Sequence, residues 1–182
     1  MDCMASNDIH LNGLDFSLFI SDHEISEMVS RVANEINVDY EKRFPLFIVM
    51  LNGAFIFAAD LLREITVPSD ITMARTKSYQ GTRSSGVVQL LLEPDIEIEN
   101  REVVIIEDIL DTGNTLHYFM DYLDKKNPKS IEVVSLLSKP DAHKYQIDIK
   151  YLGKKIPNDF VIGYGLDFDG QARNLPHIYK KI

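Results

Sequence analysis

Three carboxylates lie close together at the point where a short apolar run of the sequence ends. Glu107, Asp108 and Asp111 follow the apolar residues 103–106. Like charges held this close repel unless something neutralises them. A divalent metal or a ligand with several hydroxyl groups would do so, and hard oxygen donors suit Mg²⁺, which commonly bridges to a substrate phosphate. The cluster therefore predicts a site for Mg²⁺ or for a polyhydroxyl ligand.

The four residues that come next are suited to a phosphate group. They are Thr112, Gly113, Asn114 and Thr115, and they lead into a helical pattern. Free backbone N–H groups at a helix N-terminus bind phosphate, and a glycine lets the backbone approach the anion closely. The whole loop thus matches a ribose 5-phosphate with free hydroxyls. The alternative interpretation is a solvated acidic turn with an ordinary helix cap.

The elements around this loop define how it is positioned. Residues 102–106 form a buried strand, 107–113 a loop, 114–125 a helix and 131–137 the next buried strand. This order predicts a right-handed parallel crossover. Ligands of such sheets bind at the carboxyl ends of the strands, where the loop lies.

The remaining segments indicate an α/β protein with a mostly parallel sheet. Residues 1–20 show no clear period, and 148–182 hold short strand-like pieces broken by glycine and proline. Periodicity and turn residues predict a helix over 22–37, a strand over 46–51, a helix over 54–65, a strand over 70–74 and an antiparallel strand over 87–92.

Composition narrows the class of protein. The chain of 182 residues has a net charge of -9, which argues against a nucleic-acid binder. Its single cysteine, Cys3, allows no disulfide within the chain and fits a reducing compartment. Neither a signal peptide nor an apolar run of membrane-spanning length is visible. We therefore expect a cytoplasmic protein without a membrane or nucleic-acid partner.

The pattern V-V-I-I-E-D-I-L-D-T-G-N-T at residues 103–115 resembles the phosphoribosyl-pyrophosphate signature of the type I phosphoribosyltransferases. From about Leu46 to the C-terminal residues, the chain is most similar to the hypoxanthine-guanine enzymes of that family. The resemblance implies a single domain over 1–182, with a core at about 44–140. It also implies a small hood, formed by the N-terminal segment and about 141–182, and a flexible lid loop. Family members are usually homodimers or homotetramers, and we expect the same here.

The resemblance implies a reaction as well. Such enzymes use Mg²⁺ to move ribose 5-phosphate from phosphoribosyl pyrophosphate to N9 of a 6-oxopurine. Glu107 and Asp108 would hold the ribose hydroxyls and the metal, and residues 112–115 the 5-phosphate. Asp111 would bind the ribose-phosphate side and take up the proton of purine N7, a role that comes from the family alone.

Further site residues follow from matches to other family motifs. Asn52 and Gly53 match the pyrophosphate loop, although many relatives have a lysine in place of Asn52, so only a backbone role carries over. Ser78 and Tyr79 match the lid. Lys139 would bind the purine 6-oxo group, Phe160 would stack on the ring, and the backbone of Val161 would read the base edge. Asp167, in the purine pocket, would bind a second Mg²⁺, and Arg173 would bind pyrophosphate.

Two other classes of function remain open at this stage. A non-catalytic sensor of phosphoribosyl pyrophosphate would need a basic, nucleic-acid-binding surface, which this acidic chain lacks. A phosphatase or phosphotransferase built on Asp108 and Asp111 would not require the adjacent Thr-Gly-Asn-Thr run. The segment after Lys139 departs from the common family pattern, and His143 within it is expected to be a surface histidine.

Overall fold

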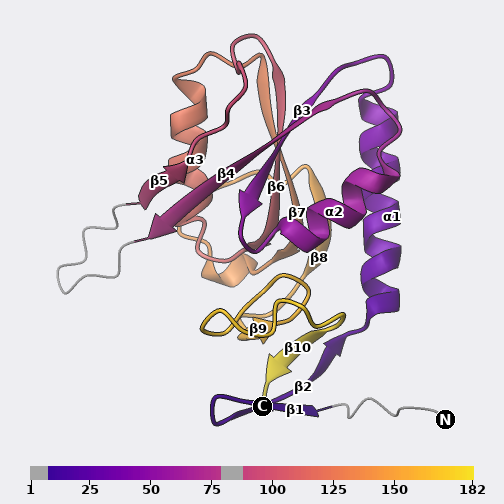
Figure 1. Cartoon of the computed structure of the whole chain (residues 1–182), viewed down its shortest axis with the longest axis vertical. Helices are drawn as coiled ribbons and strands as arrows, with labels where there is room; N and C mark the ends of the chain where they lie inside the picture. The colour runs from indigo at the N-terminus through magenta and orange to yellow at the C-terminus, as the bar shows by residue number, and fades with distance from the viewer. Residues whose placement is uncertain (1–7, 79–87) are drawn as a thin grey trace.

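The structure, a computed structural model, describes residues 8–78 and 88–182 and is built on a six-stranded sheet (Figure 1). The strand order is β5-β4-β3-β6-β7-β8. The strands are β3 (Leu46–Leu51), β4 (Asp70–Ser78), β5 (Val88–Leu92), β6 (Glu102–Leu110), β7 (Ser130–Ser138) and β8 (Tyr151–Lys155). All neighbours pair in parallel except β4 and β5, which confirms the predicted mostly parallel sheet.

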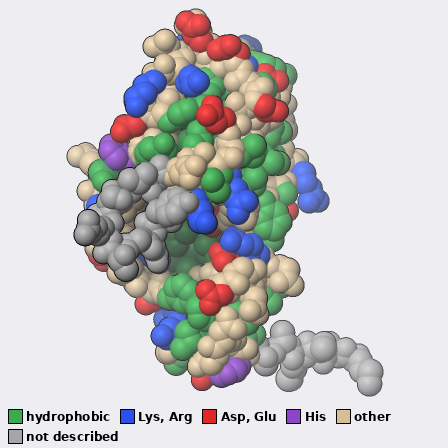
Figure 2. Space-filling view, turned by 60° about the vertical axis from the view of Figure 1, so that its left-hand side comes forward, with side chains coloured by type: hydrophobic (Ala, Val, Ile, Leu, Met, Phe, Trp, Pro, Cys, Tyr) green, Lys and Arg blue, Asp and Glu red, His purple; other side chains and the backbone are tan. Residues whose placement is uncertain are grey.

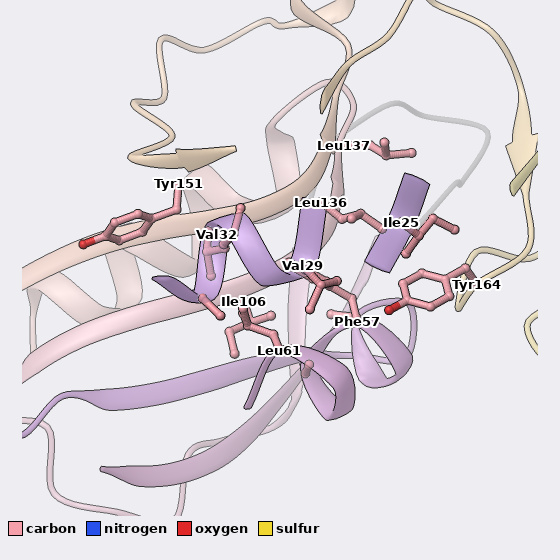
Figure 3. Packing of buried hydrophobic residues seen from close by; sticks show 14 of the residues in the cluster. Ile25, Val29, Val32, Phe57, Leu61, Ile106, Leu136, Leu137, Tyr151 and Tyr164 are labelled. Atoms are coloured by element: carbon pink, nitrogen blue, oxygen red, sulfur yellow. The ribbon is translucent and has the colours of Figure 1, made fainter. Parts of the chain in front are cut away.

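Helices cover both faces of this sheet because the central strands are apolar on both sides. The helices are α1 (Asp22–Asp39), α2 (Phe55–Glu64) and α3 (Asn114–Asp124), and a short 3₁₀ helix, η1 (Pro140–Ala142), follows β7. Alternate residues of β6 point to opposite faces of the sheet and pack against the helices on each face. Val104 and Ile106 pack with α1 and α2, and Figure 3 shows Ile106 near residues of both helices. Val103 and Ile105 pack with α3.

A second, four-stranded sheet lies beside the carboxyl ends of the large one (Figure 1). Its order is β1-β2-β10-β9, and its pairs are antiparallel. The strands are β1 (Asp8–Leu11), β2 (Leu14–Ile20), β9 (Val161–Ile162) and β10 (Ile178–Lys181). Figure 2 shows the surface hollowed where this smaller lobe meets the larger one.

Several boundaries differ from the sequence expectation. The loop predicted at 107–113 is shorter, because β6 continues to Leu110 as Glu107 and Ile109 pair with Ser135 and Leu137 of β7. Polar side chains made the end of this strand look like a loop. The two strands β1 and β2 form where no period was visible. They pair with each other, and β2 also pairs with β10, which is distant in the chain. In the part of the chain that the structure describes, no helix has both the length and the apolarity to span a membrane.

Candidate active site

Glu107 and Asp108 lie near the carboxyl end of β6, and no ion pair joins either of them to a cation within the described residues. Asp108 is 8% exposed, and Glu107 Oε2 is buried without a hydrogen-bond partner among the described residues. Burial, and then the neighbouring Asp108 charge, raise the pKa of Glu107 well above its usual value. Burial also raises the pKa of Asp108, although backbone N–H groups and the charge of Arg173 oppose the shift. The pair is therefore a desolvated acidic centre in which one carboxylate oxygen, Glu107 Oε2, has no hydrogen-bond partner among the described residues.

The loop after β3 packs its backbone directly against this centre. A Cβ atom on Gly53 would lie 1.8 Å from Asp108 Oδ2, so only glycine fits there. A Cβ atom on Gly165 would lie 2.1 Å from the Gly53 carbonyl oxygen. The Leu51–Asn52 peptide bond is cis, and Asn52 is exposed. Three segments thus meet here: the ends of β3 and β6 and the chain around Gly165.

The segment between β6 and α3 forms a small pocket. Gly113 has a φ of +80°, a conformation that favours glycine, and α3 begins directly after it without a side-chain cap. The Asn114 N–H donates to Thr112 Oγ1 at 3.4 Å. The cavity has a volume of about 110 Å³, and its lining includes Glu107 and every residue from Asp111 to Thr115. Uncapped amide groups beside a cavity can bind one phosphate group.

A buried lysine lies next to the loop aspartate. Lys139 is 6% exposed, and its Nζ is 3.2 Å from Asp111 Oδ2. The Lys139 N–H donates to the Leu110 carbonyl at 2.9 Å, which ties the end of β7 to the end of β6. The structure therefore brings Asp111 and Lys139 together although they lie on different loops. A buried ammonium and a carboxylate side by side can recognise a carbonyl and a ring nitrogen of one ligand.

Phe160 and Val161 come from the smaller lobe. Phe160 is 43% exposed, and its ring centroid lies 6.1 Å from that of Phe16 and 5.5 Å from that of Phe168. Val161 is buried in β9. A partly exposed ring that is held by two others offers a face for stacking against a planar ligand.

Arg173 and Asp167 form an ion pair in the same lobe. Arg173 Nη2 is 2.5 Å from Asp167 Oδ1, and its Nη1 donates to the Gly165 carbonyl at 2.6 Å. The Gly170 N–H donates to Asp167 Oδ2 at 2.7 Å. Because Gly165 rests on Gly53, the guanidinium stays close to the acidic centre.

The side chains of the described residues do not form a complete metal site by themselves. Within residues 8–78 and 88–182, no three acidic, histidine or cysteine side chains cluster closely enough to hold a metal. Ser78 ends β4, and Tyr79 lies outside the described residues.

Sequence reasoning missed the role of Gly165 and the environment of His143. The sequence G-Y-G at 163–165 could have drawn attention to Gly165, since two glycines flanking a tyrosine indicate an unusual backbone conformation. His143 is not the expected surface residue. Its ring is partly buried and contacts the ends of both β6 and β7.

Comparison with known proteins identifies the family of the chain. A family model described as the phosphoribosyl transferase domain matches residues 20–169. The hypoxanthine-guanine phosphoribosyltransferase of Staphylococcus epidermidis is 40% identical over 89% of this chain and 91% of that protein. The enzyme of the same name from Bacillus subtilis is 39% identical over 88% of this chain and 90% of that protein.

Solved structures give the same result. The crystal structure of a hypoxanthine-guanine phosphoribosyltransferase from Bacillus anthracis, with a HEPES molecule in its active site, is 36% identical. It matches 91% of this chain and 98% of that chain with a TM-score of 0.86. The chain also matches the bifunctional protein TilS/HprT of Listeria innocua at 40% identity, but it spans only 25% of the length of that protein. The chain therefore belongs to the phosphoribosyltransferase family, within which it groups with the hypoxanthine-guanine phosphoribosyltransferases.

Proposed function

We propose that the chain transfers ribose 5-phosphate from phosphoribosyl pyrophosphate to N9 of hypoxanthine, and of guanine, in purine salvage. The products are IMP or GMP and pyrophosphate. The observation that carries the proposal is the juxtaposition of three features at the end of β6: the acidic pair with its unpaired Glu107 Oε2 (among the described residues), a phosphate-sized pocket, and the Asp111–Lys139 pair. The full-length relatives named above support it.

The sugar donor occupies the loop after β6. Its 5-phosphate accepts hydrogen bonds from backbone N–H groups of residues 112–115, where Gly113 leaves room for the anion. The ribose hydroxyls donate to the carboxylates of Glu107 and Asp108. This contact supplies the missing partner of Glu107 Oε2.

The purine lies between the two lobes. The Lys139 ammonium donates to the 6-oxo oxygen, and Asp111 lies at N7, where it takes up the proton as N9 bonds to the anomeric carbon. Phe160 stacks on the ring, and the backbone of Val161 reads its edge. The buried position of Lys139 supports this assignment, since a buried ammonium requires an acceptor.

The leaving pyrophosphate faces the loop after β3. Backbone N–H groups at Asn52 and Gly53 hold it, and the Arg173 guanidinium offers bidentate donors. The pyrophosphate takes the electron pair of the bond that breaks, so cationic and N–H donors placed here stabilise the transition state. Ser78 and Tyr79 belong to the proposed lid that closes over this centre and excludes water.

Mg²⁺ fits the donor set of the acidic centre in chemical type. Carboxylate oxygens are the ligands it prefers, and Glu107 and Asp108 would hold it together with substrate oxygens and water. Asp167, beside Arg173, would hold a second ion. When bound, the metal supplies positive charge that neutralises the donor's phosphates.

The direct test is to incubate the purified protein with phosphoribosyl pyrophosphate, Mg²⁺ and each of hypoxanthine, guanine, xanthine and adenine, following nucleotide formation by absorbance. We expect product with hypoxanthine or guanine and none with adenine, and no product when a chelator removes Mg²⁺. Binding of the sugar donor without any product would instead favour a sensor. Cytoplasmic location and assembly into a homodimer or homotetramer stay predictions.

A further inference from the structure

The segment that follows β7 folds back over the loop that carries Asp111. Its Lys144 N–H donates to the Thr112 carbonyl at 2.9 Å. Its Tyr145 ring stacks on His117 of α3, with a centroid distance of 4.1 Å. Residues 140–147 thus brace the phosphate-binding loop from outside, and His143 lies in the middle of this brace.

The ring of His143 reaches the ends of both central strands. Its Nε2 is 3.2 Å from Ser138 Oγ and 3.3 Å from the Leu110 carbonyl oxygen. Ser138 is the residue immediately before Lys139, and Leu110 is the residue immediately before Asp111. One side chain therefore contacts the attachment points of both members of the Asp111–Lys139 pair.

The two contacts differ in what they require of the ring, since a bare Nε2 would accept from the Ser138 hydroxyl, whereas only a protonated Nε2 can donate to Leu110. A carbonyl oxygen can only accept, so a hydrogen bond to Leu110 requires a proton on Nε2. Ser138 is 1% exposed, and its hydroxyl gains a buried partner from the same nitrogen. Removing the ring would take away the contact that Nε2 makes with the buried Ser138 hydroxyl, and it would leave the Leu110 carbonyl with the Lys139 N–H alone among the described donors, so the two strand ends would lose the side chain that touches both.

We propose that His143 is a positioning residue of the transfer reaction, which holds Asp111 and Lys139 at the spacing that the purine requires. The inference rests on the proposed function, because it assigns that spacing to base recognition. His143 does not touch the substrate. It acts through Leu110 and Ser138, and a misplacement of about 1 Å in such a pair is enough to slow a reaction.

The test compares two substitutions at His143 with a control elsewhere. His143→Leu keeps volume but removes the donor, whereas His143→Gln keeps an N–H that can reach the Leu110 carbonyl. His10→Gln is the control, because His10 is an exposed histidine of β1 that bonds only Asp15 in the described contacts. For each variant, kcat and the KM values for hypoxanthine and for phosphoribosyl pyrophosphate are measured, together with the thermal unfolding midpoint.

We expect His143→Leu to lower kcat/KM for hypoxanthine about tenfold, while KM for phosphoribosyl pyrophosphate stays within about twofold. His143→Gln should recover most of the loss, and His10→Gln should match the wild type. A general structural defect would lower the unfolding midpoint and affect both substrates alike, and that result would overturn the positioning role. The positioning role would also be overturned if the His143→Leu variant were as active as an active wild type.

A readout independent of activity is the tautomer of His143, measured by ¹⁵N NMR of the imidazole nitrogens. A protonated Nε2 supports the hydrogen bond to Leu110, and a bare Nε2 overturns it. A wild type that forms no nucleotide with any base is a different result, since it contradicts the proposed function itself and removes the positioning role with it.

Discussion

The two glutamates of β6, at opposite ends of its buried stretch, have opposite environments. Glu102 lies at the amino end and is bound by Arg43 and by Lys129, whose Nζ is 3.2 Å away. Its hydrogen bonds to Arg43 lower its pKa to about 2. Glu107, toward the carboxyl end, has no cationic partner among residues 8–78 and 88–182, and burial raises its pKa. On one strand, therefore, the glutamate at the amino end has two cationic partners, and a carboxylate oxygen of the glutamate toward the carboxyl end has no hydrogen-bond partner among the described residues.

The difference shows where the fold is stabilised and where it is prepared for a ligand. A buried carboxylate without a partner destabilises the native state, because desolvation is not offset by pairing. The amino end of β6 avoids this cost with two cations. The carboxyl end does not avoid it, and under the proposed function partners within the chain would occupy the positions proposed for the ribose and Mg²⁺.

The largest expected effect concerns Asp111, just beyond the carboxyl end. Asp111→Asn should lower kcat about 100-fold, because an amide cannot take up the N7 proton, and it should leave the fold intact. Steady-state kinetics with hypoxanthine measure the loss. Asp121→Asn, on the exposed side of α3, is the matched control. Full activity of the Asp111 variant would remove this residue from proton handling.

At the amino end the effect should appear in stability instead. Glu102→Gln removes the carboxylate that Arg43 and Lys129 share, and we expect it to lower the free energy of unfolding by about 2 kcal/mol. Urea denaturation measures this change, and kcat/KM of the folded variant should equal that of the wild type. Glu99→Gln at an exposed site serves as control. A Glu102 variant with normal stability and impaired catalysis would contradict the assignment of a stabilising role to the amino end of β6.

Glu107→Gln should impair catalysis and leave stability intact, the reverse of what is expected for Glu102→Gln. We expect kcat/KM for phosphoribosyl pyrophosphate to fall about tenfold, as an amide is a poorer partner for ribose hydroxyls and Mg²⁺. The free energy of unfolding should equal or exceed the wild-type value at neutral pH, because the neutral amide relieves a desolvated acid. A clear loss of stability would show that Glu107 has a stabilising partner after all.

The smallest effect is the pH dependence of stability, which should have opposite signs at the two ends. The pKa of Glu102 is lowered from 4.5 to about 2, so its stabilisation is present above pH 4.5 and is lost as the pH falls toward 2. The pKa of Glu107 is raised, so its contribution is present below the usual pKa and is lost as the pH rises through the raised value. Unfolding midpoints against pH, for the wild type and both glutamine variants, test this. Curves with the same shape for both variants would contradict it.

The elements with local patterns could be predicted from the sequence. The apolar runs at 46–51 and 102–106 and the helical period after Ser21 gave the central strands and α1, and the structure has the capping box between Ser21 and Glu24. The order of the β6–α3–β7 unit was also predictable, because short parallel crossovers follow a fixed handedness.

Contacts between distant segments could not be predicted in this way. Nothing near Gly53 in the sequence indicates that Asp108 lies against it, or that Gly165 rests on its carbonyl. The partial burial of His143 likewise depends on two strands that end side by side. The pairing of β2 with β10 has no local signal either, since each strand alone is short and half-exposed.

That pairing also sets an order of assembly. The unit β6–α3–β7 closes over short stretches of chain and can form early, whereas β2 must find β10 across almost the whole described sequence. Phe160 is held by Phe16 of β2 and directly precedes β9 in the same sheet. The entropy of loop closure therefore favours early formation of the loop between β6 and α3, whereas the contact of Phe160 with Phe16 requires that the two ends of the described chain have met.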